Sequence, residues 1–310
     1  MIRLAIVGCR NMGKKHLEII RENFSNETEV VGILNSTKES TVAVATEVGV
    51  KALESLDDIN KDSFDAVIVA TPAENHFATA ANLIKKQIPL LVEKPFAATL
   101  KEALKLKEMA EEFNTPILVG HTENYNPAVD AVIKDITLPV KKISGIRTSC
   151  NPGFKKALVI SELMIHDLAI VNSFTDEKPI KKKVTKRKEY RWDEDAIVEM
   201  TYANGMEVCL RATRANVERE RQMEIVDAKN NTYEIEFLER RASKNGAILP
   251  CTGDSLVFEM ADFLNMVKTG SNPRVSVDEA CRCVEICEAL EKNCKGVLGF
   301  WNGNIRSAQI

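Results

Sequence analysis

The first 120 residues alternate short apolar runs with amphipathic segments, and this alternation constrains the fold more than any other feature. The segments Glu74–Gln87 and Leu100–Phe113 have apolar residues at helical spacing. The short runs are β-branched or leucine-rich and apolar on both faces: Ile2–Val7, Val30–Leu34, Ala66–Ala70, Pro89–Val92 and Ile117–Val119. Such runs are typical of the buried strands of a parallel sheet. Their repeated order, strand then helix, predicts an α/β fold with a doubly wound parallel sheet and right-handed crossovers.

After about residue 121 the pattern becomes that of antiparallel strands. Two runs of period two, over 196–202 and 206–212, flank Asn204-Gly205, which is the strongest short hairpin signal. A second pair of such runs flanks Lys229-Asn230-Asn231. Helices are expected over 255–268 and 277–295.

These patterns divide the chain into two domains. The N-terminal domain is expected over residues 1–121, and a C-terminal α+β domain with a large, mostly antiparallel sheet over 122–310. Because one face of that sheet lacks enough helices to cover it, we expect a homodimer or homotetramer that assembles through it.

Charge and composition exclude several classes of function. The 310 residues carry a formal net charge of −3, which gives no general attraction to nucleic acid or to an anionic membrane. The basic run over 181–188 has no interleaved aromatic residue, so we interpret it as a solvated edge strand. No apolar run reaches the roughly 20 residues that a bilayer-spanning helix needs, and no cationic leader precedes the first strand. We therefore predict a cytoplasmic protein.

The eight cysteines do not form a metal-binding pattern. Cys283 and Cys287 would lie one helical turn apart, but there is no Cys-x-x-Cys pair and no histidine near them. We interpret the cysteines as thiols in a reducing compartment and expect no metal ion.

A glycine turn follows the first strand and precedes a helix. Its sequence, Gly8-Cys9-Arg10-Asn11-Met12-Gly13, is a G-x-G-x-x-G frame with Arg10 in place of the middle glycine. In such a frame, backbone N–H groups and a helix N-terminus bind a pyrophosphate. Its position predicts a Rossmann domain with cofactor contacts from Gly8, Arg10, Asn11, Met12 and Gly13. An ordinary strand-to-helix turn is the alternative.

The end of the second strand bears on the choice of cofactor. Asn35-Ser36-Thr37-Lys38 contains no carboxylate for a ribose diol, whereas its hydroxyls and its cation suit a 2′-phosphate. We therefore predict that these four residues contact the cofactor and that NADP is preferred over NAD. The alternative is a plain N-cap that opens a helix over 38–48.

Histidine and lysine side chains gather at one edge of the predicted sheet. His16, His76 and His121 follow the carboxyl ends of strands, and Lys94 ends another strand in Glu93-Lys94-Pro95. This edge is where open α/β sheets bind ligands, although a structural role is the alternative for each histidine.

Glu162 and His166 form a second group of candidate residues. They are four residues apart and would share one face of a helix. A carboxylate and an imidazole so placed are suited to proton transfer near neutral pH.

These segments together resemble the glucose–fructose oxidoreductase and inositol dehydrogenase family (Gfo/Idh/MocA). The family pattern is a glycine turn ending in G-x-x-H, a Thr-Pro-x-x-x-His segment, Glu-Lys-Pro, a Gly-His stretch ending in Asn-Pro, and an Asp-x-x-x-His-Asp helix. The matching segments cover essentially the whole chain and are Gly13 to His16, Thr71-Pro72 to His76, Glu93-Lys94-Pro95, Gly120-His121 to Asn126-Pro127, and Glu162 to His166-Asp167.

The resemblance implies a hydride transfer between a nicotinamide cofactor and a secondary alcohol of a sugar, cyclitol or nucleotide sugar. His166 would take the hydroxyl proton, Lys94 would hydrogen-bond the same oxygen, and Glu162 would orient the substrate. It also implies a cis Lys94–Pro95 peptide. The further cofactor contacts implied are Thr71, Pro72, His76, Glu93 and Lys94, and the substrate contacts are Lys94, Asn124, Tyr125, Asn126, Glu162 and His166.

Three residues depart from the family pattern. Arg10 replaces a glycine, Glu162 an aspartate and Asn124 an arginine. They motivate the alternative of a catalytically inactive sensor or partner subunit that binds nucleotide or sugar.

Overall fold

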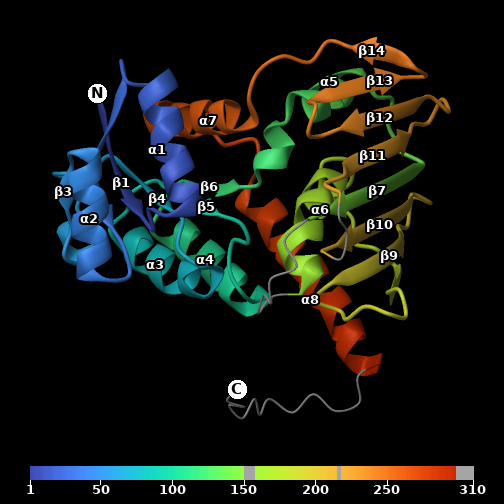
Figure 1. Cartoon of the computed structure of the whole chain (residues 1–310), viewed down its shortest axis with the longest axis horizontal. Coiled ribbons are helices and arrows are strands. Elements are labelled where there is room, and N and C mark those ends of the chain that lie inside the picture. Colours follow the sequence, from blue (N-terminus) through green and yellow to red (C-terminus); the bar gives the residue numbers. More distant parts are fainter. Residues whose placement is uncertain (150–157, 215–217, 298–310) are drawn as a thin grey trace.

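The computed structural model describes residues 1–149, 158–214 and 218–297. Figure 1 shows two layered domains side by side, with helices of the C-terminal part running back between them. Residues 2–7 form the strand expected from their apolar run, and the two domains meet along the edge where that strand ends. The candidate site lies at this edge.

The N-terminal domain is a six-stranded parallel sheet in the order β3-β2-β1-β4-β5-β6. Its strands are β1 (Ile2–Val7), β2 (Thr28–Leu34), β3 (Lys51–Ala52), β4 (Ala66–Val69), β5 (Leu90–Glu93) and β6 (Ile117–Gly120). Its helices are α1 (Asn11–Asn23), α2 (Lys38–Val48), α3 (Ala73–Lys85) and α4 (Leu100–Glu112). This strand order is that of a Rossmann fold, so the predicted fold class is confirmed. The two-residue strand β3 was not expected from the sequence.

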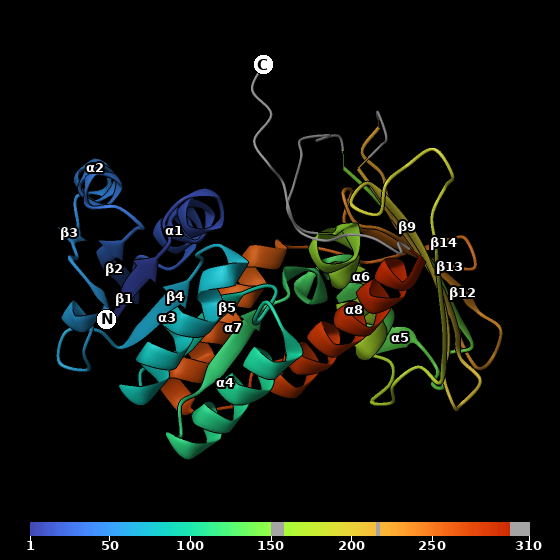
Figure 2. The same cartoon turned by 90° about the horizontal axis from the view of Figure 1, so that it is seen from below.

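The strands of this sheet bury both faces. Ala5 and Val7 pack with α3 and α4, whereas Leu4 and Ile6 pack with α1. Figure 2 shows α1 and α2 on one side of the sheet and α3 and α4 on the other. This two-sided burial explains why the strands are apolar throughout rather than alternating.

The C-terminal domain is built on an eight-stranded sheet in the order β14-β13-β12-β11-β7-β10-β9-β8. Its strands are β7 (Lys142–Thr148), β8 (Lys181–Thr185), β9 (Asp195–Thr201), β10 (Glu207–Thr213), β11 (Arg221–Val226), β12 (Thr232–Glu236), β13 (Arg241–Lys244) and β14 (Ala247–Leu249). Among the paired strands of this second sheet that the structure describes, only β7 and β10 are parallel. Both predicted hairpins are confirmed, and residues 181–185 of the basic run form the edge strand β8.

Three helices of the C-terminal part pack on one face of the large sheet: α5 (Pro127–Asp135), α6 (Ile165–Asn172) and α8 (Val277–Val297). A fourth, α7 (Ser255–Thr269), packs against the first domain instead. Met260 and Phe263 of α7 pack in the core beneath α1, and Ala280 of α8 packs with α3 and α4. The two C-terminal helices therefore hold the domains together, while a boundary between residues 121 and 122 stays a prediction.

No helix in the described part of the chain combines the length and apolar character needed to cross a membrane.

Candidate active site

A cavity of about 580 Å³ lies at the carboxyl ends of β1, β2, β4 and β5, in the size range of small-molecule sites. Ten of the residues predicted to contact the cofactor line it: Gly8, Arg10, Asn11, Met12, Asn35, Ser36, Thr71, Pro72, Glu93 and Lys94. The other four, Gly13, Thr37, Lys38 and His76, are not among its lining residues.

Close backbone contacts shape the floor of this cavity. Gly8 has a φ of 93°, and a Cβ atom there would lie 2.6 Å from backbone atoms of Ala70 and Thr71. A Cβ at Gly13 would lie 2.5 Å from the carbonyl oxygen of Gly8. Because a side chain at either position would clash with backbone, β1, β4 and α1 approach this closely only with glycine there.

The replacement of the middle glycine by Arg10 does not disturb the turn. Arg10 has a φ of −116°, outside the left-handed region, and its exposed side chain projects at the cavity. No side chain caps the N-terminus of α1 and its first turn contains no acid. The open N–H groups of this turn fit the pyrophosphate of a dinucleotide.

The side chains after β2 connect the turn to α2. The Asn35 amide oxygen accepts a hydrogen bond from the Cys9 N–H at 2.8 Å, and its amide nitrogen donates to the Ser40 carbonyl at 3.1 Å. Thr37 is the N-cap of α2 and accepts from the Ser40 N–H. The N-cap interpretation therefore describes Thr37, while Ser36 lines the cavity and Lys38 is exposed.

His76 links two segments of the cavity wall instead of lining it. Its ring nitrogens lie 2.7 Å from the Pro95 carbonyl oxygen and 2.8 Å from the Thr71 carbonyl oxygen. The Lys94–Pro95 peptide is cis, as the resemblance implied. His76 thus fixes the Thr71-Pro72 segment against the segment that carries Lys94.

Lys94 reaches across to the C-terminal domain. Its ammonium group donates to the backbone carbonyl oxygen of Glu162 at 2.9 Å. The Glu162 carboxylate is ion-paired with Arg214, which is nearly buried and also donates to the Asp193 carbonyl at 2.7 Å. Lys94 and Glu162, two of the predicted site residues, therefore lie together, but Arg214 was missed. Arg214 directly follows β10, and no sequence signal distinguished it from the arginines of the antiparallel strands.

His166 and His121 lie close to Lys94 at the junction of the domains. Residues 160–164 form a π-helical turn before α6, and His166 is the second residue of α6. Burial, followed by the positive charges of Lys94 and Arg147, lowers the pKa of His166 well below its ordinary value. Burial and Lys94 lower the pKa of His121 to about 4. Both imidazoles are therefore neutral at pH 7, and a neutral imidazole can accept a proton.

A buried ion network holds α6 against the sheet, and the sequence analysis missed it. Arg147 of β7 donates to the Asp167 carboxylate at 2.7 Å and to Glu123 at 2.8 Å. Arg221 of β11 pairs with the same Glu123. Because Asp167 follows His166 directly, this network sets the position of the imidazole.

The three residues predicted to bind substrate before α5 are buried and bonded to other protein groups. Asn124 donates to Ser173 and to the Ala169 carbonyl. The Tyr125 hydroxyl donates to Asp262, and Asn126 caps α5. Their hydrogen bonds hold this segment in place, and the substrate site that we propose does not include them.

The comparisons with known proteins agree with this geometry. Residues 2–121 match the family model described as an oxidoreductase family with an NAD-binding Rossmann fold (GFO_IDH_MocA). The chain is 27% identical over 284 residues to UDP-N-acetylglucosamine 3-dehydrogenase from Acidithiobacillus ferrooxidans. The aligned region covers 86% of this chain and 88% of that protein.

Solved structures have the same fold over nearly the whole chain. A structure of the same Acidithiobacillus ferrooxidans dehydrogenase superposes with a TM-score of 0.86 at 23% identity, covering 96% of this chain and 99% of the other. GenD2 from gentamicin A biosynthesis, in complex with NAD, superposes with a TM-score of 0.81 at 17% identity. The superposition covers 95% of this chain and 94% of the other.

Proposed function

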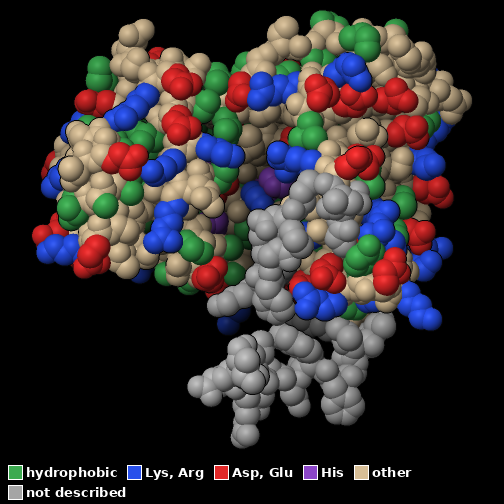
Figure 3. Space-filling model, in the orientation of Figure 1, with side chains coloured by type: hydrophobic (Ala, Val, Ile, Leu, Met, Phe, Trp, Pro, Cys, Tyr) green, Lys and Arg blue, Asp and Glu red, His purple; other side chains and the backbone are tan. Residues whose placement is uncertain are grey.

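Since the chain belongs to the Gfo/Idh/MocA oxidoreductase family and is a nicotinamide-dependent dehydrogenase, we propose that it transfers a hydride between its cofactor and a ring hydroxyl of a nucleotide sugar. The observation that carries this proposal is the hollow between the domains, in which Figure 3 shows Lys and Arg side chains beside histidine. Lys94 reaches the Glu162 carbonyl from the Rossmann domain, whereas the buried Arg147 is already balanced by Asp167 and Glu123. Such a cleft suits a substrate with a diphosphate. The nucleotide-sugar dehydrogenase among the relatives supports the same class.

We assign roles to the site residues from the family resemblance, and their positions support the assignment. Neutral His166 accepts the hydroxyl proton, and Lys94 hydrogen-bonds the same oxygen and stabilises the charge that develops on it. Glu162, held by Arg214, orients the sugar. The nicotinamide, when bound in the cavity over the glycine turn, supplies the hydride acceptor or donor.

The alternative of an inactive sensor gains no support. The backbone at Arg10 does not need a glycine, and the Glu162 carboxylate has a defined cationic partner. The comparisons contain nothing that favours this alternative.

Absorbance at the reduced nicotinamide band tests the substrate class directly. Uridine nucleotide sugars, other nucleotide sugars, free sugars and cyclitols are incubated separately with the protein, once with each cofactor. We expect turnover with at least one nucleotide sugar and a much lower kcat/KM with the matching free sugar. A higher kcat/KM with a free sugar or cyclitol would contradict the substrate class, and no turnover with any compound would contradict the activity.

We also propose that NADP binds more tightly than NAD. Arg10 and Ser36 line the cavity, and Lys38, two residues after Ser36, is exposed. The end of β2 has no acid that would repel a 2′-phosphate. Lys38→Ala is expected to weaken NADP binding by about 1–3 kcal/mol, the contribution of a charge-assisted hydrogen bond, and to leave NAD binding unchanged. Fluorescence titration of both cofactors measures this, and tighter binding of NAD to the unaltered protein would contradict it.

A homo-oligomer that buries the outer face of the large sheet, and a cytoplasmic location, stay predictions. Light scattering at micromolar concentration tests the first, because a monomeric mass would contradict it.

A further inference from the structure

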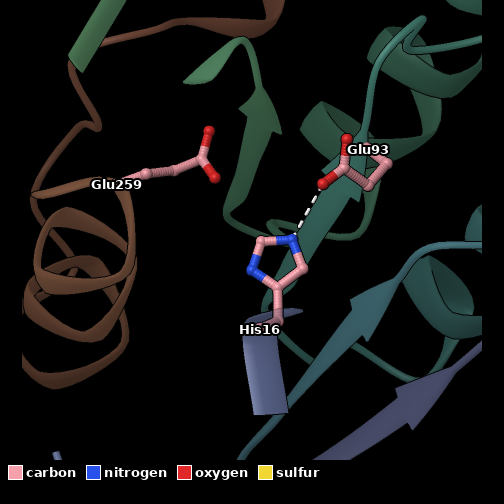
Figure 4. A group of neighbouring side chains, drawn as sticks. All are labelled: His16, Glu93 and Glu259. Atoms are coloured by element: carbon pink, nitrogen blue, oxygen red, sulfur yellow. Dashed lines mark hydrogen bonds and ion pairs between the residues drawn. The ribbon is translucent and has the colours of Figure 1, made fainter. Parts of the chain in front are cut away.

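Three ionisable side chains from separate elements meet beneath the cofactor cavity. His16 comes from α1, Glu93 from the end of β5 and Glu259 from α7, and all three are at least nine-tenths buried. One candidate ligand atom of each lies within 4.8 Å of the other two. Figure 4 shows the Glu259 carboxylate directed toward the space beside His16 and Glu93.

The hydrogen bonds of this group are incomplete. His16 Nε2 lies 2.8 Å from the Glu93 carboxylate, but His16 Nδ1 has no hydrogen-bond partner among the described residues. Glu259 is fully buried and the Thr122 side chain lies beside it, but neither of its carboxylate oxygens has a hydrogen-bond partner of good geometry among the described residues. Burying an acceptor without a partner is costly, so this space is suited to a further bound group.

The chemistry of the side chains limits what that group can be. Glu93 and Glu259 are both buried, and each offers a carboxylate oxygen within 4.8 Å of the other. Two buried carboxylates this close need a positive charge between them, either a proton or a cation.

We propose that His16, Glu93 and Glu259 bind a divalent transition-metal ion, with Zn²⁺ as the best match. One imidazole nitrogen and two carboxylate oxygens are ligands that Zn²⁺ takes at about 2.0–2.2 Å, and its two positive charges balance both carboxylates. Ligands at that bond length lie about 3.4 Å apart in a tetrahedron, so the three side chains need only small rotations. This proposal departs from the expectation of no metal, which considered only the cysteines.

The ion would act as a structural link between the domains. It would fasten α7, which the sequence places in the C-terminal domain, to α1 and β5 of the Rossmann domain. Because Glu93 also lines the cofactor cavity and accepts from the Lys94 N–H at 3.2 Å, the same ion would fix the backbone beneath Lys94.

Metal content and thermal stability test the proposal without reference to activity. The full-length protein is treated with a chelator, dialysed against micromolar Zn²⁺ and analysed by mass spectrometry for bound metal. We expect about one ion per chain and a higher thermal midpoint than in the chelated protein. Glu259→Gln keeps the side-chain shape and should lower Zn²⁺ affinity at least tenfold, since even residues outside the ligand shell change affinity by about 10–100-fold. Glu18→Gln, an exposed change on the same helix as His16, is the matched control and should bind Zn²⁺ normally.

Each outcome decides the question. If the unaltered chain takes up no ion, or if Glu259→Gln binds Zn²⁺ as tightly as the unaltered chain, the proposal is wrong. If neither protein takes up an ion and Glu259→Gln is at least as stable as the unaltered chain, Glu259 holds a proton and the metal site is ruled out. If Glu259→Gln does not fold, the metal content of the unaltered chain alone decides, with one equivalent supporting the site and none overturning it.

Discussion

The two sides of the candidate active site are built by different kinds of interaction. On the cofactor side, backbone lies against backbone, and Gly8 and Gly13 allow β1, α1 and β4 to approach within contact distance. On the substrate side, ion pairs between distant segments hold the reactive groups, with Arg214 on Glu162 and Arg147 on Asp167. The first side therefore depends on steric fit and the second on charge.

This difference means that substitutions should fail in different ways on the two sides. A change on the cofactor side should alter packing and cofactor affinity, whereas a change on the substrate side should alter turnover or leave a buried charge without its partner.

The largest effect is expected at His166. His166→Ala should lower kcat by about 10²–10⁴, the usual effect of losing a general acid–base group, and Lys94→Ala by a similar factor. The double variant should lose less than the product of the two, because both groups act on one proton transfer. Cofactor affinity should change little, since the phosphates bind at the glycine turn. Steady-state kinetics and thermal midpoints, measured on the same preparations, separate a loss of kcat from a loss of folding. Full activity in a folded His166→Ala protein would contradict the proposed mechanism.

The next effect is expected at Arg147. Arg147→Met leaves Asp167 and Glu123 buried without their shared cation, and it should lower the free energy of unfolding by about 3–5 kcal/mol. Arg3→Met breaks an ion pair with Asp65 that is about one-third exposed and lies in the Rossmann domain, and it should have a much smaller effect. Urea unfolding of both variants measures the difference. Equal losses would show that charge is no more important on the substrate side.

The same contrast explains what the sequence could predict. Apart from the short β3, the strands and helices of the Rossmann domain were predicted to within a few residues, because their apolar periodicity is local and both faces of the sheet are buried. The Asn204-Gly205 hairpin was predicted for the same reason, and Gly205 has the positive φ of 85° that such a turn needs. The cofactor cavity followed from the glycine turn, whose chemistry is written in consecutive residues.

The ion pairs of the substrate side could not be predicted in this way. Arg214 and Glu162 are 52 residues apart, and Arg147 meets Asp167 only because β7 passes beside α6. Charged residues at these positions look in the sequence like ordinary surface residues. The spacing of Glu162 and His166 also assumed a regular helix, whereas residues 160–164 form a π-helical turn. Asn124 resembled a site residue by motif, but its amide is directed at α6.

His121, which lies between the two sides, should make stability depend on pH. Its pKa is about 4 in the folded protein and near 6.5 when unfolded, so the unfolded chain binds the proton first as the pH falls. Stability present above pH 6.5 should be lost progressively down to about pH 4, by about 3 kcal/mol in total.

His121→Leu should remove this part of the pH dependence. The other titrating groups, including Glu259 with its opposite shift, are present in both proteins and cancel in the comparison. Unfolding free energies of both proteins at pH 8 and pH 4 measure it. The same decrease in both would mean that His121 does not carry the effect.

The smallest effect separates steric fit from backbone conformation on the cofactor side. Gly8 and Gly49 both have a positive φ, 93° and 78°, so alanine is strained at either position by about 1 kcal/mol. A Cβ at Gly49 meets nothing within 4 Å, whereas one at Gly8 meets the backbone of Ala70 and Thr71 at 2.6 Å. Gly8→Ala should therefore cost about 1–3 kcal/mol more than Gly49→Ala, the usual penalty of overpacking, and should weaken cofactor binding, which Gly49→Ala leaves unchanged. Urea unfolding and NADP titration of both variants measure the two differences. If the two glycines prove equally replaceable, then contact between β1 and β4 does not shape the cofactor side, and the contrast with the substrate side loses its physical basis.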